Sequence, residues 1–141
     1  MSTPVKSKAP RGRKPSRPHA WPIGCGVDVV ELERFRQAVK RWGEAFLERI
    51  FTEDERKYAH GHQDAVRRLA VRFAAKEAVV KAMAQVDPSR PLTLRQIEIQ
   101  NDELGRPYVV LRHQPKDHPA VYVSLSHAEH LAIASAIVSR R

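Results

Sequence analysis

One uninterrupted helix-forming segment, from Val66 to about Gln85, limits the possible folds of this chain more than any other feature. Its residues are strong helix formers, it contains neither Gly nor Pro, and the letters PSRP end it. Beyond it the period changes, because Val and Ile recur at alternate positions. This alternation predicts strands at Gln96–Gln100, Pro107–Arg112, Ala120–Leu125 and Leu131–Ser139, with a hairpin turn at Asn101–Gly105 between the first two.

The residues before the long helix predict a strand and two shorter helices. Ile23–Val30 alternates so that Ile23, Cys25, Val27 and Val29 share a face. Apolar spacings of three and four then predict a helix carrying Leu32, Phe35, Val39, Trp42 and Phe46, interrupted near Gly43. Thr52–Glu55 forms a capping-box pattern that begins a helix ending near His60. The expected fold class is therefore α+β, with an antiparallel meander packed on one long helix and shorter helices flanking it.

Charge and length divide the chain into a tail and one domain. The protein has 141 residues, a hydrophobic fraction of 42% and a net charge of +9. Residues 1–20 hold six basic residues, four prolines and no acid, so the other 19 basic and 16 acidic residues leave 21–141 at +3. We interpret 1–20 as a flexible basic tail, either a nucleic-acid-binding arm or a solvated extension, and 21–141 as one folded domain.

Several classes of protein are excluded by what the sequence lacks. It has no apolar run of 18 residues, and the tail has no apolar core of the secretory type, so we expect no membrane partner and no secretory signal. Cys25 is the single cysteine, which excludes an intrachain disulfide and a Cys-rich zinc site. We therefore expect a cytoplasmic protein.

Asp28 interrupts an apolar strand segment, where aspartate is disfavoured. Burying an unpaired carboxylate is costly, so Asp28 should be paired with a cation or bound to a metal. The ordinary alternative is that it caps the helix beginning near Val30 or Glu31.

Glu77 is the second carboxylate in an unexpected place. Phe73, Leu69 and Val80 lie at helical spacing from it, so Glu77 falls on the stripe expected to face the sheet. Lys81, four residues on, offers an ordinary ion pair worth about 0.3–0.5 kcal/mol, which does not explain the buried side. Two desolvated carboxylates from separate elements can hold Mg²⁺, which completes its shell with water and phosphate oxygens.

Basic groups near these acids favour a diphosphate-bearing substrate. Arg72, Lys76 and Lys81 lie on the same predicted helix as Glu77. His127 lies in SLSHAEH between two strands, where it could contact phosphate, act as a base, or be an ordinary loop histidine.

Five motifs together resemble a known family. IGCGVDVVELERF, RIFTEDE, RFAAKEAVVKA, NDELGRPYV and VSLSHA occur in that order within 22–139 and resemble the small, holo-[acyl-carrier-protein] synthase type of 4'-phosphopantetheinyl transferase. The resemblance implies the fold of that family and a homotrimer with active sites between subunits. It also implies Mg²⁺-dependent transfer of 4'-phosphopantetheine from coenzyme A to a serine of apo acyl carrier protein. The other product is adenosine 3',5'-bisphosphate, and the reaction supports fatty acid or polyketide biosynthesis.

The resemblance also implies roles for individual residues. Asp28 and Glu77 match the acids that bind the metal, and Glu77, Lys81 and His127 are the implied catalytic residues. Ala128 stands where some relatives carry an acid, with Glu129 after it. The implied coenzyme A-binding residues are Arg72, Lys76, Lys81, Asn101, Gly105, Arg106, Pro107, Ser126 and His127.

A basic helix face is the implied docking site for the carrier protein. Arg34 and Arg41 are seven residues apart and share a face with Ala38. Acyl carrier proteins are acidic, so complementary charge would guide their binding. A solvated helix face is the alternative.

The implied mechanism leaves one role open, and two other functions compete with it. The carrier serine would attack the β-phosphorus in line with the departing bisphosphate, and Glu77, a metal-bound water or His127 could take its proton. A metal-dependent nuclease or phosphohydrolase could use the same acids, although such sites often present Glu-x-Lys on a strand. A nucleic-acid-binding module would suit the tail, but the domain has few aromatic residues and a charge of only +3, so we expect no nucleic-acid partner.

Overall fold

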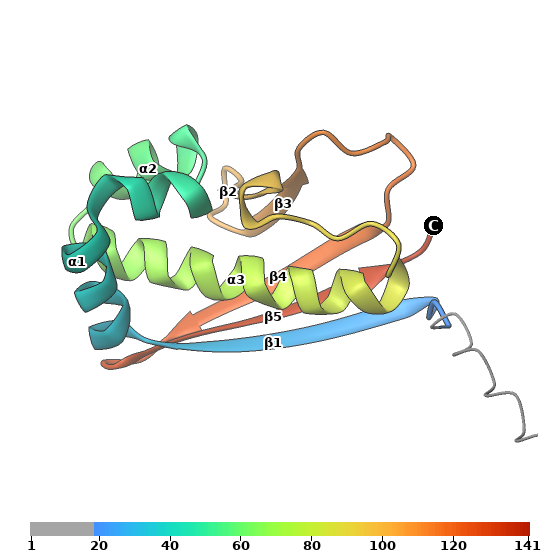
Figure 1. Ribbon diagram of the computed structural model, residues 1–141, viewed down its shortest axis with the longest axis horizontal. Coiled ribbons are helices and arrows are strands. Elements are labelled where there is room, and N and C mark those ends of the chain that lie inside the picture. The colour runs from blue at the N-terminus through green and yellow to red at the C-terminus, as the bar shows by residue number, and fades with distance from the viewer. Residues whose placement is uncertain (1–18) are drawn as a thin grey trace, which may run out of the picture.

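A long helix lies across one face of a three-stranded sheet in the computed structural model, which describes residues 19–141 (Figure 1). The expected α+β class, with an antiparallel sheet on one long helix, is confirmed. None of the described helices is long and apolar enough to cross a membrane. The elements are β1 (Ile23–Glu31), α1 (Leu32–Ile50), α2 (Glu53–His60), α3 (Ala65–Val86), the 3-10 turn η1 (Leu94–Gln96), β2 (Ile97–Asn101), β3 (Pro107–Leu111), β4 (Ala120–His127) and β5 (Leu131–Ser139).

The first strand of the sheet pairs with the last strand of the chain. The strand order is β1-β5-β4, and both pairings are antiparallel. β2 and β3 form a separate two-stranded sheet, which confirms the predicted hairpin. The expectation of one continuous meander was wrong. The long-range pairing of β1 with β5 leaves no local signal in the sequence, and it makes β1 and β4 the two edges of the main sheet.

Small residues allow α3 to approach β1 closely. Gly24 and Gly26 lie on the strand face that packs against α3, and a Cβ added to either would lie 2.1 Å from the carbonyl oxygen of Ala82 or Ala78 respectively. Asp28 is two residues further along the same strand face. The glycines therefore bring the Asp28 carboxylate close to α3.

Gly26→Ala is expected to destabilise the protein by about 3 kcal/mol. The new methyl group would clash with a carbonyl oxygen of α3, which cannot move unless the helix backbone moves with it. Urea-induced unfolding would measure this loss. Gly61→Ala is the matched control, since its added Cβ would meet nothing closer than 3.6 Å. We expect the control to change the free energy of unfolding by less than about 1 kcal/mol. Similar losses in both variants would contradict the close-packing argument.

Helix α1 is broken at Gly43, whose φ of 63° and ψ of −152° favour glycine. The predicted interruption is therefore confirmed. Trp42, expected on the apolar stripe of this helix, is instead 60% exposed, because the change of direction beside it ends the regular spacing. Beyond the break, the helix packs against the protein interior through the buried residues Leu47 and Ile50.

The face of the main sheet that points away from α3 is apolar and exposed. It carries the alternating β1 residues predicted to share a face, together with residues of β4 and β5. Ile137, on the central strand, is 51% exposed. Contiguous exposed apolar surface of this kind marks an interaction site. We call this surface the open sheet face and define it by Ile23, Cys25, Val27, Val29, Tyr122, Ile133 and Ile137.

Candidate active site

Asp28 of β1 and Glu77 of α3 line the same cavity, of about 400 Å³, which we call the acid cavity. Burial raises the pKa of Glu77, and the negative charge of Asp28 raises it further, while Lys81 partly offsets both. The alternative role for Asp28 as a helix cap was wrong, because Glu31 is the N-cap of α1. The remaining lining residues include Arg34, Phe35, Ala38, Phe46 and Phe73.

The acid cavity is chemically suited to a hard divalent cation. Asp28 and Glu77 bring carboxylate oxygens together, and their mutual repulsion, seen in the raised pKa of Glu77, would be relieved by a bound cation. Within residues 19–141 no cluster of three or more His, Cys, Asp or Glu side chains is suited to a metal. The protein would therefore supply two carboxylate ligands.

Lys81 pairs with Asp28 rather than with Glu77. Its ammonium lies 2.9 Å from Asp28 Oδ1 and donates to the Val27 carbonyl oxygen at 3.0 Å. Lys81 remains 51% exposed, so its charge stays available at the edge of the site. The ion pairs found within residues 19–141 do not include the expected one between Glu77 and Lys81.

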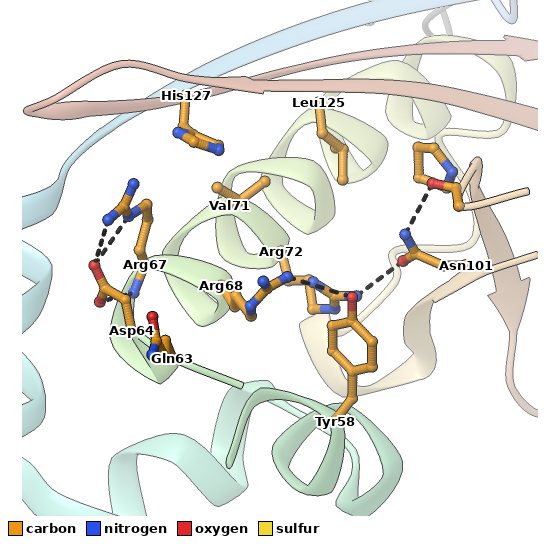
Figure 2. Close-up of a pocket in the computed structure, with 12 residues that line it drawn as sticks. Tyr58, Gln63, Asp64, Arg67, Arg68, Val71, Arg72, Asn101, Leu125 and His127 are labelled. Atoms are coloured by element: carbon orange, nitrogen blue, oxygen red, sulfur yellow. Dashed lines mark hydrogen bonds and ion pairs between the residues drawn. The ribbon is translucent and has the colours of Figure 1, made fainter. Parts of the chain in front are cut away.

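A second cavity, of about 530 Å³, lies between α2, α3, the β2–β3 hairpin and β4 (Figure 2). We call it the arginine cavity. Five of the predicted coenzyme-binding residues line it: Arg72, Asn101, Gly105, Pro107 and His127. Other residues of its lining were not predicted from the sequence, chiefly Tyr58, Gln63, Asp64, Arg67 and Arg68.

Arg72 is held at the centre of the arginine cavity. Its Nη2 donates to Asn101 Oδ1 at 3.0 Å, and its guanidinium lies 4.2 Å from the centre of the Tyr58 ring. Arg72 is only 5% exposed, and burial lowers its pKa. We call Tyr58, Arg72 and Asn101 the coenzyme cluster.

Two guanidinium nitrogens in this cavity are buried without a protein partner. They are Nε of Arg72 and Nε of Arg68. Arg68 also donates to the Tyr58 hydroxyl at 3.4 Å (Figure 2). Arg67, by contrast, is neutralised by Asp64, whose carboxylate lies 2.8 Å from Arg67 Nη2. Arg68 and Arg72 are therefore the cations available to an anionic ligand.

Lys76 differs most from its expected role. It is 0% exposed and lines neither cavity. Its ammonium lies 2.6 Å from Glu55 Oε2 and donates to two backbone carbonyl oxygens. The structure therefore corrects the expected direct contact of Lys76 with coenzyme A, because this side chain points into the protein interior and its protons are already engaged.

Ser126 and His127 point to opposite faces of the sheet. His127 lines the arginine cavity, whereas Ser126 lies opposite Ile133 on the side of the open sheet face. His127 is the last residue of β4 and not the turn residue that was expected. Of the residues expected at the hairpin turn, Arg106 lies outside the cavity lining and pairs with Asp102 at 2.7 Å.

The proposed docking residues lie along α1 beside the acid cavity. Arg34 and Ala38 line that cavity, and Arg41 lies further along the helix with its guanidinium 5.0 Å from the Trp42 ring centre. Arg34, Arg41 and Trp42 are exposed.

Comparisons with known proteins agree with this geometry. Residues 24–136 match the model of the 4'-phosphopantetheinyl transferase superfamily. A holo-[acyl-carrier-protein] synthase of Thermodesulfovibrio yellowstonii is 37% identical over 82% of this chain and 97% of its own length. The corresponding protein of Chlorobaculum tepidum is 41% identical with the same coverage. A holo-(acyl-carrier-protein) synthase of Bacillus anthracis, solved in complex with CoA (3',5'-ADP), aligns with a TM-score of 0.70 and 32% identity over 84% of this chain and 96% of that one.

Proposed function

This chain belongs to the 4'-phosphopantetheinyl transferase superfamily and is a phosphopantetheinyl transferase, and we propose the following full reaction for it. The enzyme transfers 4'-phosphopantetheine from coenzyme A to a serine of apo acyl carrier protein, with Mg²⁺, and releases adenosine 3',5'-bisphosphate. The observation that carries the proposal is the combination of the acid cavity with a separate arginine cavity, of about 530 Å³, where the Nε atoms of Arg68 and Arg72 lack a protein partner and suit a nucleotide.

The two cavities lie on opposite sides of α3. Asp28 belongs to the edge strand β1 and His127 to the other edge strand, β4, with β5 between them. Two strand spacings place these edges about 10 Å apart, and the cavities share no lining residue. We infer that one coenzyme molecule uses the acid cavity of one subunit and the arginine cavity of its neighbour.

This division supports a homotrimer with active sites between subunits. A contact between two different edges is head-to-tail, and such contacts form a ring when the rotation between subunits closes. The open sheet face supplies apolar surface that association would bury. We therefore assign the cytoplasmic enzyme a cyclic assembly in which each subunit completes its neighbour's site.

In the proposed reaction, the serine Oγ of the carrier protein attacks the β-phosphorus of coenzyme A. A bond from Oγ to phosphorus forms while the bond from phosphorus to the bisphosphate oxygen breaks. Asp28 and Glu77 would hold Mg²⁺, which when bound neutralises charge on the diphosphate. Lys81 stabilises phosphate oxygens, and Arg72 with His127 holds the nucleotide. Among the chain's own groups, Glu77 and His127 are the candidates for the base that takes the serine proton.

The domain boundaries are also part of the proposal. We assign the transferase to residues 21–141, in agreement with the family match at 24–136. The basic tail, 1–20, lies outside that match, and its residues 1–18 lie outside the described structure. A carrier protein of fatty acid or polyketide synthesis is the proposed partner, and nucleic acid is not.

A direct test is to mix the purified protein with coenzyme A, Mg²⁺ and apo carrier protein and to measure adenosine 3',5'-bisphosphate. We expect its release to require all three additions. Release without carrier protein would favour the competing phosphohydrolase, since water would then be the acceptor.

Reversing two charges on α1 tests the docking surface. In the double variant Arg34→Glu/Arg41→Glu, we expect the KM for carrier protein to rise by about tenfold or more, because an acidic partner would meet like charges. The KM for coenzyme A should rise less than the KM for carrier protein, since neither residue lines the arginine cavity. Lys116→Glu, an exposed reversal on the loop before β4, is the matched control. Equal increases in both KM values would contradict docking at this face.

A further inference from the structure

A buried ion pair lies behind the arginine cavity. Glu55 of α2 and Lys76 of α3 are 2% and 0% exposed, with 2.6 Å between Oε2 and Nζ. Lys76 Nζ also donates to the carbonyl oxygens of Ile50, at 2.7 Å, and Leu94, at 3.1 Å. The three protons of the ammonium therefore have three protein acceptors.

Glu55 extends this connection to α2 and β2. Its Oε2 accepts the backbone N–H of Thr52 at 2.9 Å, which completes the predicted capping box, and its Oε1 accepts the N–H of Ile99 at 2.8 Å. The pair thus joins the end of α1, the start of α2, the middle of α3, η1 and β2.

The buried contacts lie directly beneath the coenzyme cluster. Three or four residues along a helix, and two along a strand, return a side chain to the same side of the element. Each residue of the cluster is related by such a step to a buried one: Tyr58 to Glu55 in α2, Arg72 to Lys76 in α3, and Asn101 to Ile99 in β2. The buried contacts therefore support the three residues of the coenzyme cluster.

We propose that the Glu55–Lys76 pair positions the coenzyme cluster. The pair thereby sets the affinity for coenzyme A without contacting the coenzyme. This proposal rests on the transferase function proposed above. A buried ion pair gives little net stability compared with apolar residues of the same size, so stability alone is a weak reason for placing one here. Its geometric effect is stronger, because it fixes α2, α3 and β2, which carry the coenzyme cluster, relative to one another.

The test compares Glu55→Gln, Lys76→Met and the double variant carrying both changes. In each, we expect the KM for coenzyme A to rise by about tenfold or more, since a displaced cluster binds poorly. The Kd for adenosine 3',5'-bisphosphate, measured by calorimetry, should rise in parallel. The KM for carrier protein should stay within about twofold of the wild-type value, because α1 residues 34–41 do not contact the pair.

The double variant separates positioning from stability. It leaves no buried charge unpaired, so its Tm should recover relative to the worse single variant, whereas its KM for coenzyme A should remain high. Val138→Ala, a fully buried change in β5, is the control that lowers Tm without raising this KM. Recovery of the KM together with Tm, or an unchanged KM in a folded single variant, would overturn the proposal. An inactive wild-type protein would instead overturn the transferase reaction.

Discussion

Asp28→Asn and Glu77→Gln are each expected to lower the rate of phosphopantetheine transfer by about a thousandfold or more. Each change removes one of the two carboxylates that line the acid cavity and replaces it with a neutral amide, a weaker ligand for Mg²⁺. Single-turnover measurements at saturating Mg²⁺ and coenzyme A would isolate this effect. The Kd for adenosine 3',5'-bisphosphate should change little, because neither carboxylate lines the arginine cavity.

Glu129→Gln is the matched control for these variants. Glu129 follows Ala128, where some relatives carry an acid, but its side chain is 88% exposed and lies 3.8 Å from His130. We expect activity within about twofold of the wild type. A loss in Glu129→Gln as large as that in Glu77→Gln would contradict a site built on two carboxylates.

The Glu77→Gln variant should also be more stable than the wild type at neutral pH when Mg²⁺ is removed. Burial, and then Asp28, raises the pKa of Glu77 in the folded protein. Folding stability is therefore lost as pH rises from the unfolded-state pKa through the higher folded-state pKa. The gain in Tm should be present above that range and vanish below the unfolded-state pKa. Thermal unfolding in chelator would measure it, and a lower Tm at neutral pH would contradict this view of the acid pair.

Ile137→Lys is expected to separate the assembly into monomers and to lower activity by about a hundredfold. Ile137 lies on the central strand of the open sheet face, so association would bury the new ammonium without a partner. The isolated subunit should keep its Tm, because Ile137 is already 51% exposed in it. Activity should fall because each acid cavity loses the neighbouring arginine cavity. Sedimentation velocity would report the change of mass.

Leu104→Lys tests whether the effect is specific to that face. Leu104 is 78% exposed but lies in the β2–β3 turn, away from the open sheet face. We expect the wild type and Leu104→Lys to sediment as trimers. A fully active monomeric wild type would contradict the proposal of shared active sites.

Local signals predicted much of the fold. The Thr52–Glu55 pattern begins α2 with both bonds of the capping box, and the helix formers after Ala65 continue to Val86. Alternating Val and Ile placed the later strands within about two residues of their observed bounds. Asp28 and Glu77 could be selected because a carboxylate on an apolar face needs a partner, and the structure places both at one cavity.

Features that depend on contacts distant in sequence could not be predicted in the same way. The pairing of β1 with β5 places the two cavities on opposite edges, and no short pattern encodes it. From the sequence, Lys76 was predicted to be a phosphate ligand. Its actual acceptors belong to Ile50, Glu55 and Leu94, which lie on other elements and could not be identified from the helix alone. Arg68 is one helical turn before Arg72, so its place in the arginine cavity could have been inferred from that spacing.

The proposed transfer can be followed in the intact mass of apo carrier protein, measured after incubation with this protein, coenzyme A and Mg²⁺. We predict that the carrier gains the mass of one phosphopantetheine group. The gain should disappear when the carrier's acceptor serine is replaced by alanine, and it should be strongly slowed with Asp28→Asn or Glu77→Gln. A carrier whose mass is unchanged after incubation with the wild-type enzyme would show that this protein does not perform the transfer.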